Sequence, residues 1–373
     1  MIVDQLVAPV PGGIGRYTEE LTRELISTAP AGSTVEAIIS ASSRSESDRL
    51  RQLLPGLSTF TTTPLGRREL SLAWQFGLMP LRGTDAVHAP SLLAPLVPRS
   101  RRRSPHPTVV TIHDVVPWSH PGTLTPRGVS WHRAMATRAE RFADAVVVPT
   151  HAVAAELGAI LNLGDRIHVI GGAASSKLAV PADADERAVR LNLPPRFILS
   201  VGTLEPRKGL APLIASLAHT EDASLPLLIA GPAGWGTLDV ATIATEAGLQ
   251  ADRVRTLGYL SDADLAVVLH RATVFVFPSL AEGFGLPLLE AFSVGTPVVH
   301  SDAPALVEVA GGAGRVVTLA GAGSYPERLA NAITAVTSDP VTAERMVSAG
   351  LDRVASYSWR TSAQRVWELH SGL

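Results

Sequence analysis

Short runs of Val, Ile and Leu recur along the chain, and each is bounded by Gly, Pro, Asp or Ser. Longer amphipathic stretches, which have the length of helices, separate these runs. Apolar runs without polar alternation are typical of strands that are buried on both faces of a parallel sheet. Strand and helix patterns that alternate in this way predict an α/β fold with parallel sheets.

The pattern predicts strands in both halves of the chain. In the first half they fall at MIVDQLV (1–7), TVEAIIS (34–40), DAVHAP (85–90), TVVTIHD (108–114), DAVVVPT (144–150) and RIHVIGG (166–172). In the second half they fall at FILSVGT (197–203), PLLIAGP (226–232), VRTLGYL (254–260), TVFVFPS (273–279) and TPVVHSD (296–302). Each half therefore has enough strands for a sheet of its own.

Chain length and a change in composition predict two domains. A chain of 373 residues exceeds what one hydrophobic core usually supports. Residues 173–192 interrupt the strand-helix rhythm with small, polar and proline residues, so we take them as a linker between domains 1–172 and 193–356. Ser358 then caps a final helix, residues 357–373, which is long enough to return toward the first domain.

Composition narrows the class of protein. With 46% hydrophobic and 18% charged residues the chain is globular, and it has no apolar run of membrane-spanning length. The N-terminal stretch lacks the basic start and apolar core of a signal peptide, and the absence of cysteine agrees with a cytoplasmic enzyme. A net charge of -2 predicts no binding to nucleic acid.

Ligands of open α/β sheets bind beyond the carboxyl ends of the strands, so the strand-to-helix loops hold the candidate site residues. In VPGGIGRYTEEL (10–21), Gly13 and Gly15 let backbone amides approach an anion, and a helix is predicted to begin near Arg16. The spacing also approximates the dinucleotide motif G-x-G-x-x-G, with Thr18 in place of the third glycine. A dinucleotide-dependent oxidoreductase and a simple tight turn are the alternatives.

Two further loops carry candidate chemistry. His113 follows a predicted central strand in TIHDVVP, either as a functional histidine or as a hydrogen-bonded structural one. In SVGTLEPRKGL, Gly202 ends a strand, and Arg207 and Lys208 then present two adjacent cations. Such a pair suits a diphosphate, although a solvated basic loop would have the same sequence.

The stretch EGFGLPLLEAF places Glu282 at the exit of a predicted strand and Glu290 about one turn into the next helix. Pro287 lies near the first position of that helix, where a missing N–H costs nothing. Gly283 and Gly285 free backbone amides between the two acids, so the segment can hold sugar hydroxyls, a phosphate and a ribose. Two unrelated acids, one of them a helix cap, are the alternative.

The sequence DAD occurs at residues 183–185 and 262–264 and resembles the carboxylate pairs that bind metal ions in some transferases. Ser261 and Asp264 are better explained as a helix cap, and the first copy lies in the linker. We therefore expect no metal site.

Taken in order, these motifs resemble the retaining GT-B glycosyltransferases of family GT4, and within it the mannosyltransferase-like branch. The resemblance rests on GGIGRY, IHD followed by a proline, GTLEPRK, and two glutamates separated by seven residues, Glu282 and Glu290. It covers nearly the whole chain. It implies two Rossmann-like domains whose parallel sheets face each other across a cleft, the first binding the acceptor and the second a nucleotide sugar.

The resemblance also implies a role for each motif. Arg207 and Lys208 would bind the donor pyrophosphate, and Glu290 would hold the ribose. Glu282 and the amides of three residues would hold the donor sugar, and those three are Phe284, Gly285 and Leu286. Gly15 would lie near the phosphates, His113 beside the reacting sugar, and Gly258 and Tyr259 near the nucleobase. The donor acts as a substrate, and the family needs no metal or other cofactor for transfer.

The expected reaction moves a hexose, with mannose favoured, from GDP-mannose or a UDP-sugar to a glycan or a lipid-linked acceptor. A catalytically silent partner protein with the same fold is a further alternative. The basic run RSRRR (99–103), together with Arg67, Arg68 and Arg82, suggests a contact with anionic lipid head groups on the cytoplasmic face of a membrane. A solvated loop would have the same composition.

Overall fold

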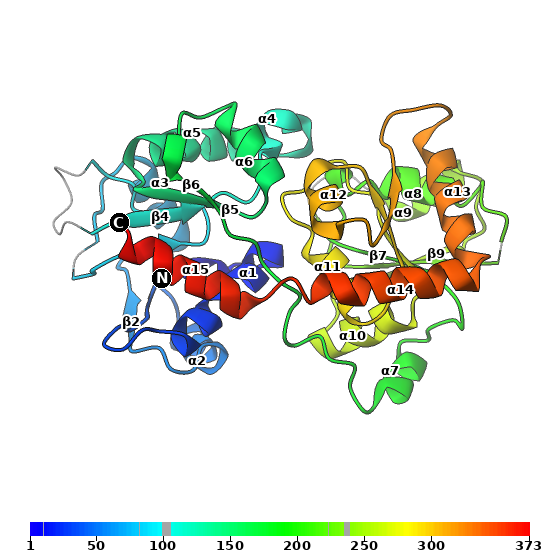
Figure 1. Cartoon of the computed structure of the whole chain (residues 1–373), viewed down its shortest axis with the longest axis horizontal. Helices are drawn as coiled ribbons and strands as arrows, with labels where there is room; N and C mark the ends of the chain where they lie inside the picture. Colours follow the sequence, from blue (N-terminus) through cyan, green and yellow to red (C-terminus); the bar gives the residue numbers. More distant parts are fainter. Residues whose placement is uncertain (10, 82, 99–105, 223, 235–238) are drawn as a thin grey trace. The chain divides into compact units, whose positions relative to one another are not determined.

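The computed structural model describes residues 1–9, 11–81, 83–98, 106–222, 224–234 and 239–373. The chain forms two compact units (Figure 1). The first unit combines Met1–Gly172 with Ser358–Leu373, and the second unit is Ala173–Tyr357. Residues 173–192, which the sequence suggested as a linker, are thus grouped with the second unit.

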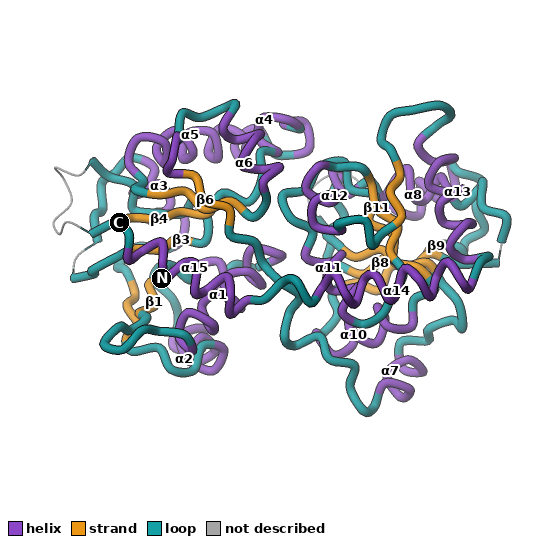
Figure 2. Tube along the Cα trace, in the orientation of Figure 1, coloured by secondary structure: helices purple, strands orange, loops and turns teal. Residues whose placement is uncertain are grey.

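The first unit is built on parallel strands (Figure 2). Four of them form a sheet in the order β3-β4-β5-β6: β3 (Val87–Ala89), β4 (Thr108–Thr111), β5 (Ala145–Val148) and β6 (Ile167–Val169). A second parallel pair joins β1 (Glu36–Ile39) to β2 (Thr59–Thr62). The helices are α1 (Gly12–Ser27), α2 (Arg44–Leu53), α3 (Arg67–Gln75), α4 (Val116–Ser119), α5 (Pro126–Phe142), α6 (His151–Gly158) and α15 (Trp359–Ser371).

Among its described residues, the second unit has one parallel sheet of six strands in the order β12-β11-β10-β7-β8-β9. They are β7 (Ile198–Val201), β8 (Leu227–Ala230), β9 (Val254–Gly258), β10 (Val274–Phe277), β11 (Val298–Ser301) and β12 (Arg315–Val317). The helices are α7 (Ala184–Arg190), α8 (Leu210–Ser216), α9 (Val240–Glu246), α10 (Asp262–Arg271), α11 (Leu286–Ser293), α12 (Pro304–Ala310), α13 (Tyr325–Thr337) and α14 (Pro340–Val354).

The central strands of the second unit are buried on both faces, as their uniformly apolar sequences predict. Phe275 and Phe277 of β10 belong to a core cluster that also includes residues of α10, α11 and α12. The alternate residues Val274 and Val276 belong to a second cluster with α8 and α13. Because neighbouring side chains on a strand point to opposite faces, helices cover both sides of this sheet.

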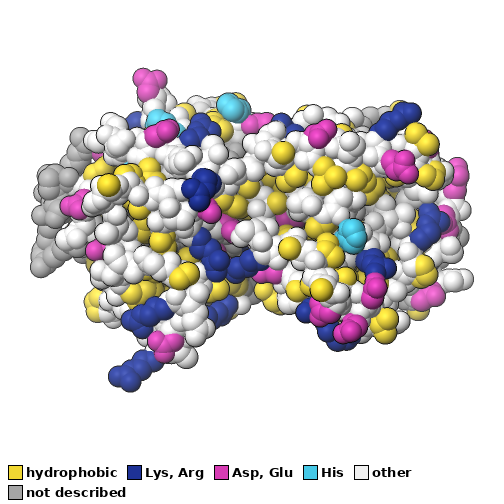
Figure 3. Space-filling view, turned by 60° about the horizontal axis from the view of Figure 1, so that its bottom comes forward, with side chains coloured by type: hydrophobic (Ala, Val, Ile, Leu, Met, Phe, Trp, Pro, Cys, Tyr) yellow, Lys and Arg dark blue, Asp and Glu magenta, His cyan; other side chains and the backbone are white. Residues whose placement is uncertain are grey.

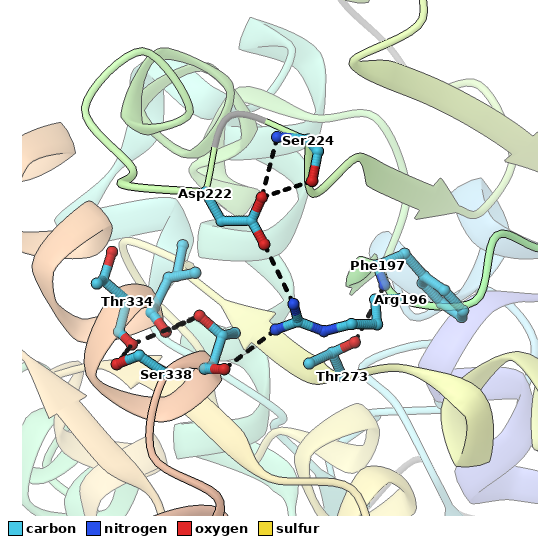
Figure 4. Close-up of polar contacts among 9 residues, drawn as sticks. Arg196, Phe197, Asp222, Ser224, Thr273, Thr334 and Ser338 are labelled. Atoms are coloured by element: carbon cyan, nitrogen blue, oxygen red, sulfur yellow. Dashed lines mark hydrogen bonds and ion pairs between the residues drawn. The ribbon is translucent and has the colours of Figure 1, made fainter.

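The start of β7 is held by polar contacts at the amino-terminal edge of the sheet (Figure 4). The Arg196 guanidinium donates to the Asp222 carboxylate at 3.2 Å and to the Thr337 carbonyl at 3.1 Å. The Phe197 amide donates to the Thr273 hydroxyl at 3.1 Å. These contacts lie at the edge opposite to the loops with candidate site residues.

One predicted strand was wrong. In the segment 1–7 only Ile2 forms a β-bridge, to Ile38, and Asp4–Val7 is a 3-10 helix. The reason is Asp4, which is fully buried and accepts from the Ser40 amide at 2.8 Å while pairing with Arg67 at 2.9 Å. Strands β2 and β12 were missed because TFTT and RVV are short and partly exposed.

The acids of the two DAD sequences take part in ion pairs around α7. Arg187 contacts Asp183 at 2.7 Å and Asp264 at 2.8 Å, and Arg190 contacts Asp264 at 2.5 Å. The Ser261 hydroxyl accepts from the Asp264 amide and caps α10. Acidic and basic side chains also lie close to one another elsewhere on the visible face of the second unit, on the right of Figure 3.

Candidate active site

The turn with Arg207 and Lys208 follows β7 and is tied to the loop after β10. Pro206–Lys208 is a single 3-10 turn, which Gly209 ends in the left-handed conformation at φ 65°. A Cβ atom on Gly209 would lie 2.2 Å from the Pro278 carbonyl oxygen, so only glycine fits there. The Leu280 amide also donates to the Arg207 carbonyl at 2.8 Å. The backbone itself therefore brings the two loops together.

The side chains of these loops form a compact charged cluster, which we call the Glu282 cluster: Arg207, Lys208 and Glu282. The Lys208 ammonium donates to the Glu282 carboxylate at 2.6 Å, and the Arg207 guanidinium lies 3.1 Å from the same oxygen. Arg207 also donates to the Ala281 carbonyl at 2.8 Å. The three side chains are only 10 to 15% exposed.

Burial and charge act in opposite directions on this cluster. Burial alone would raise the pKa of the Glu282 carboxyl, but the cations Lys208 and Arg207 outweigh it and lower that pKa to about 2. Burial lowers the pKa of Lys208, and the Glu282 carboxylate opposes this shift. The Lys208 ammonium also lies 5.4 Å from the centre of the Phe277 ring, a cation–π contact. The cluster is thus a largely buried network in which the Glu282 carboxylate contacts both cations.

Helix α11 begins beside the cluster. Gly285 is its N-cap residue at φ 99°, and a Cβ atom there would lie 2.5 Å from the Leu306 side chain. Pro287 is the second helical residue, close to the predicted first position. Phe284 is buried and packs edge-to-face on Tyr357 at 5.8 Å. The turn that precedes α11 is therefore set by packing.

Glu290 lies in the second turn of α11 and is only 3% exposed. Glu282 and Glu290 flank the N-terminus of this helix, as the two-glutamate pattern predicted. A buried carboxylate is stable only where opposite charges or hydrogen-bond donors compensate for the lost water, so an acid is retained here at a cost that polar neighbours must offset.

The neighbouring strands place three more predicted residues at the same edge of the sheet. The Gly202 amide donates to the Ala230 carbonyl at 2.9 Å, and the Gly231 amide donates to the Gly258 carbonyl at 2.8 Å. Gly258 ends β9 in the left-handed conformation at φ 67°, and the following Tyr259 is 79% exposed. The second-half predictions thus converge on the carboxyl ends of β7, β9 and β10.

In the first unit the glycine motif differs from the prediction. Helix α1 begins at Gly12, so Gly13 and Gly15 lie in its first turn, and the predicted start near Arg16 was wrong. The Gly15 amide donates to the Pro11 carbonyl at 2.9 Å, and a Cβ atom on Gly15 would lie 2.4 Å from the Pro11 ring. The glycines let the helix start one turn earlier than the sequence suggested.

His113 lies two residues after β4. Its Nε2 donates to the Pro90 carbonyl at 2.7 Å, and its ring lies edge-to-face with Tyr17. Burial lowers its pKa, although the Pro90 carbonyl and the Asp114 carboxylate oppose this shift. Neutral imidazole is therefore the dominant form at pH 7.

Two neighbours of the predicted residues were missed. Glu205 lies 3.7 Å from Arg207, and Tyr17 contacts His113. Both are part of motifs that the resemblance used, GTLEPRK and GGIGRY, but neither received a role. Their membership in those two motifs is the sequence feature that could have identified them as site residues.

Of the suggested lipid-binding arginines, Arg82 and residues 99–103 lie outside the described residues. Arg67 serves an internal role, because it pairs with Asp4 and donates to the Gln5 side chain at 2.7 Å. Arg68 is exposed on α3. Within the described ranges, each helix is too short or too polar to cross a membrane.

Both halves of the chain match glycosyltransferase family models. Residues 11–173 match the model described as Glycosyltransferase Family 4, and residues 182–353 match Glycosyl transferases group 1. The O-antigen chain mannosyltransferase B of Escherichia coli is 42% identical over 123 residues, which cover 32% of each chain. The phosphatidyl-myo-inositol mannosyltransferase of Mycobacterium leprae is 34% identical over 169 residues, covering 44% of this chain and 43% of that one.

These two alignments thus cover less than half the length of each relative. Among solved structures, Anabaena Alr3699/HepE in complex with UDP and glucose superposes with a TM-score of 0.75 at 21% identity, covering 100% of this chain and 99% of that one. This likeness shows the fold, which is GT-B. With both halves matched and the fold shared, the chain belongs to the GT-B glycosyltransferases of family GT4 and is similar to their mannosyltransferases.

Proposed function

We propose that this protein transfers a hexose, with mannose favoured, from a nucleotide diphosphate sugar to a glycan or a lipid-linked acceptor, with retention of the anomeric configuration. The observation that carries the proposal is the Glu282 cluster, in which two largely buried cations lie in the loop after β7, beside the loop after β10. The cations are held in place by the backbone contacts of Gly209 and Leu280 before any ligand arrives.

The cluster suits the chemistry of a departing diphosphate. During transfer, the bond from the sugar C1 to the β-phosphate oxygen breaks, and a bond from C1 to an acceptor oxygen forms on the same face. The acceptor's proton passes to a phosphate oxygen of the donor, and the products are the glycoside and the nucleoside diphosphate. Negative charge grows on the diphosphate as C1 becomes oxocarbenium-like, so preorganised cations lower the barrier.

The roles of the other site residues are proposals of the same kind. Glu290 would hold the ribose, Glu282 and the backbone amides of residues 284–286 the donor sugar, and Gly258 with Tyr259 the base. Gly13 and Gly15 would lie near the phosphates, and His113 beside the reacting sugar. We propose no metal or other cofactor, since two cations and a helix N-terminus supply positive charge.

The sugar is inferred from the two relatives whose names specify mannose transfer. For the nucleotide we propose GDP, with UDP as the competing choice, because the HepE structure contains UDP and glucose. A thermal-shift screen of GDP, UDP and ADP with their sugars decides between them, since a ligand that binds the native state raises its melting temperature. A larger shift with a UDP-sugar than with GDP-mannose would contradict the choice of GDP.

The test of the function is transfer by Lys208→Ala and Glu290→Gln. We expect each to lower turnover about 100 to 1000-fold, the usual cost of one lost contact to developing charge. Arg345→Ala and Glu344→Gln, exposed residues of α14, are the matched controls and should behave like the wild type. Wild-type turnover in both site variants would refute the proposal.

We also propose that the first unit contacts anionic lipid through α3 and the residues that directly follow it, as a lipid-linked acceptor would require. Leu72, Phe76 and Leu78 are 45, 62 and 73% exposed, and Arg68 shares a helix face with Leu72. Replacing the three apolar residues by Ser should abolish sedimentation with phosphatidylglycerol vesicles, whereas Val189→Ser on α7 should not. Sedimentation that does not depend on anionic lipid would contradict this contact.

A further inference from the structure

Three aromatic rings from distant parts of the chain form a row in the first unit. The Tyr17 ring on α1 lies edge-to-face with the His113 imidazole, with centroids 4.8 Å apart and planes at 86°. The same ring lies edge-to-face with Trp359, the first residue of α15, at 5.5 Å and 72°. Tyr17 is 4% exposed and Trp359 is 6% exposed. Two buried rings, Tyr17 and Trp359, therefore support the half-buried His113 ring and restrict its motion.

Independent contacts fix α15, which lies beside α1 (Figure 1). The Trp367 indole donates to the Leu25 carbonyl of α1 at 3.1 Å. The Ser362 hydroxyl donates to the Gly171 carbonyl at 2.7 Å, and Ser358 caps the helix. Trp359 is thus a fixed support for Tyr17 and not a mobile end of the chain.

The hydrogen bond between His113 and the Pro90 carbonyl sets the tautomer of the ring. Since a carbonyl oxygen only accepts, Nε2 carries the proton that it donates to Pro90. In the neutral ring, Nδ1 is then the unprotonated nitrogen and can accept a hydrogen bond. One hydrogen bond still allows the ring to swing about its axis. The edge-to-face contact with Tyr17 removes this freedom, because such pairs have a preferred geometry.

We propose that Tyr17 and Trp359 are positioning residues, which hold the His113 imidazole in one orientation and one tautomer with Nδ1 as acceptor toward the substrate. The catalytic meaning of the row rests on the proposed function, in which His113 lies beside the reacting sugar. The row itself is a property of the free protein. Its effect on the imidazole is therefore measurable without any substrate.

The experiment compares Tyr17→Leu with Tyr17→Phe, which keeps the ring and loses only the hydroxyl. We expect Tyr17→Leu to lower kcat about 10 to 100-fold, as for a misaligned catalytic group, with the donor KM changed less than twofold. Tyr17→Phe should restore most of kcat. In ¹⁵N spectra, His113 should show the Nε2–H tautomer in the wild type and in Tyr17→Phe. It should show mixed tautomers, and a pKa closer to 6.5, in Tyr17→Leu.

The two readouts separate this inference from the proposed function. If the wild type transfers no sugar, the change of the His113 resonances in Tyr17→Leu still supports the row, and only the function fails. Wild-type kcat together with wild-type His113 resonances in Tyr17→Leu would overturn the positioning role. If Tyr17→Leu does not fold, Trp359→Leu against Trp359→Phe gives the same test. Trp359→Leu should change kcat and the His113 resonances in the same direction as Tyr17→Leu, but less. The absence of both changes would likewise overturn the positioning role.

Discussion

At the scale of single residues, Glu282 is the charge that makes a buried lysine possible. Burial lowers the pKa of the Lys208 ammonium, and the carboxylate 2.6 Å away offsets part of this shift. Since removing one partner of a buried ion pair leaves the other charge uncompensated, we expect Glu282→Gln to lower the free energy of unfolding by roughly 3 kcal/mol at pH 7. Urea unfolding measures this loss, and Glu344→Gln is the exposed control.

The pH dependence of that loss has a definite sign. The folded-state pKa of Glu282, about 2, lies below its ordinary value of 4.5. The carboxylate therefore stabilises the fold above pH 4.5, and this contribution is lost as pH falls toward 2. The difference between wild type and Glu282→Gln should shrink over this range. A difference that stays constant from pH 7 to pH 3 would show that the ion pair is not its source.

At the scale of elements, Gly209 joins the turn after β7 to the end of β10. A side chain here meets both a left-handed backbone at φ 65° and the Pro278 carbonyl. We expect Gly209→Ala to cost at least about 1 to 2 kcal/mol from the backbone alone, and more from the displaced carbonyl. Gly158→Ala, at the end of α6 with open space around it, should be tolerated. Equal melting temperatures of the two variants would contradict this.

Near its end, helix α15 contacts the sheet of the first unit through a pair of titratable side chains, His370 and His88. Nδ1 of His88 on β3 lies 3.2 Å from Nε2 of His370, and burial followed by the N-terminal ammonium lowers the pKa of His370 to about 4. The unfolded chain binds the proton more readily, so this stability is present above pH 6.5 and lost as pH falls toward 4. We expect a loss of about 2 kcal/mol between pH 7 and 5.

His370→Gln removes one protonation step, so its stability should depend less steeply on pH than that of the wild type. Urea unfolding followed by tryptophan fluorescence reports on this, because Trp359 and Trp367 lie on the same helix. Identical pH slopes for the two proteins would assign the acid sensitivity to other groups.

At the scale of the whole molecule, apolar runs were enough to predict the central strands and the α/β class. Strands such as β5 and β10 are buried over their full length, so their sequences carry the pattern of a parallel sheet. The pattern gave a wrong prediction where the contacts of one polar side chain determine the backbone conformation. Asp4 turns a strand-like N-terminus into a 3-10 helix through Ser40 and Arg67, which are distant in sequence.

The candidate site likewise has a part that could be predicted from the sequence and a part that could not. Arg207, Lys208 and Glu282 could be predicted because two short motifs contain them. The ion pairs among them, the close approach at Gly209 and the contact of Tyr17 with His113 depend on which loops become neighbours. Such neighbours are set by the order of strands in a sheet, which local periodicity does not encode.

The first unit is made of two separate pieces of chain, with the whole second unit between them. During synthesis, the first 172 residues leave the ribosome long before Trp359 and Trp367 do. Domains usually mature in the order in which they are translated. Here all residues of the second unit are made before the first unit is complete, and the surface of α1 that contacts α15 stays uncovered until α15 has been made.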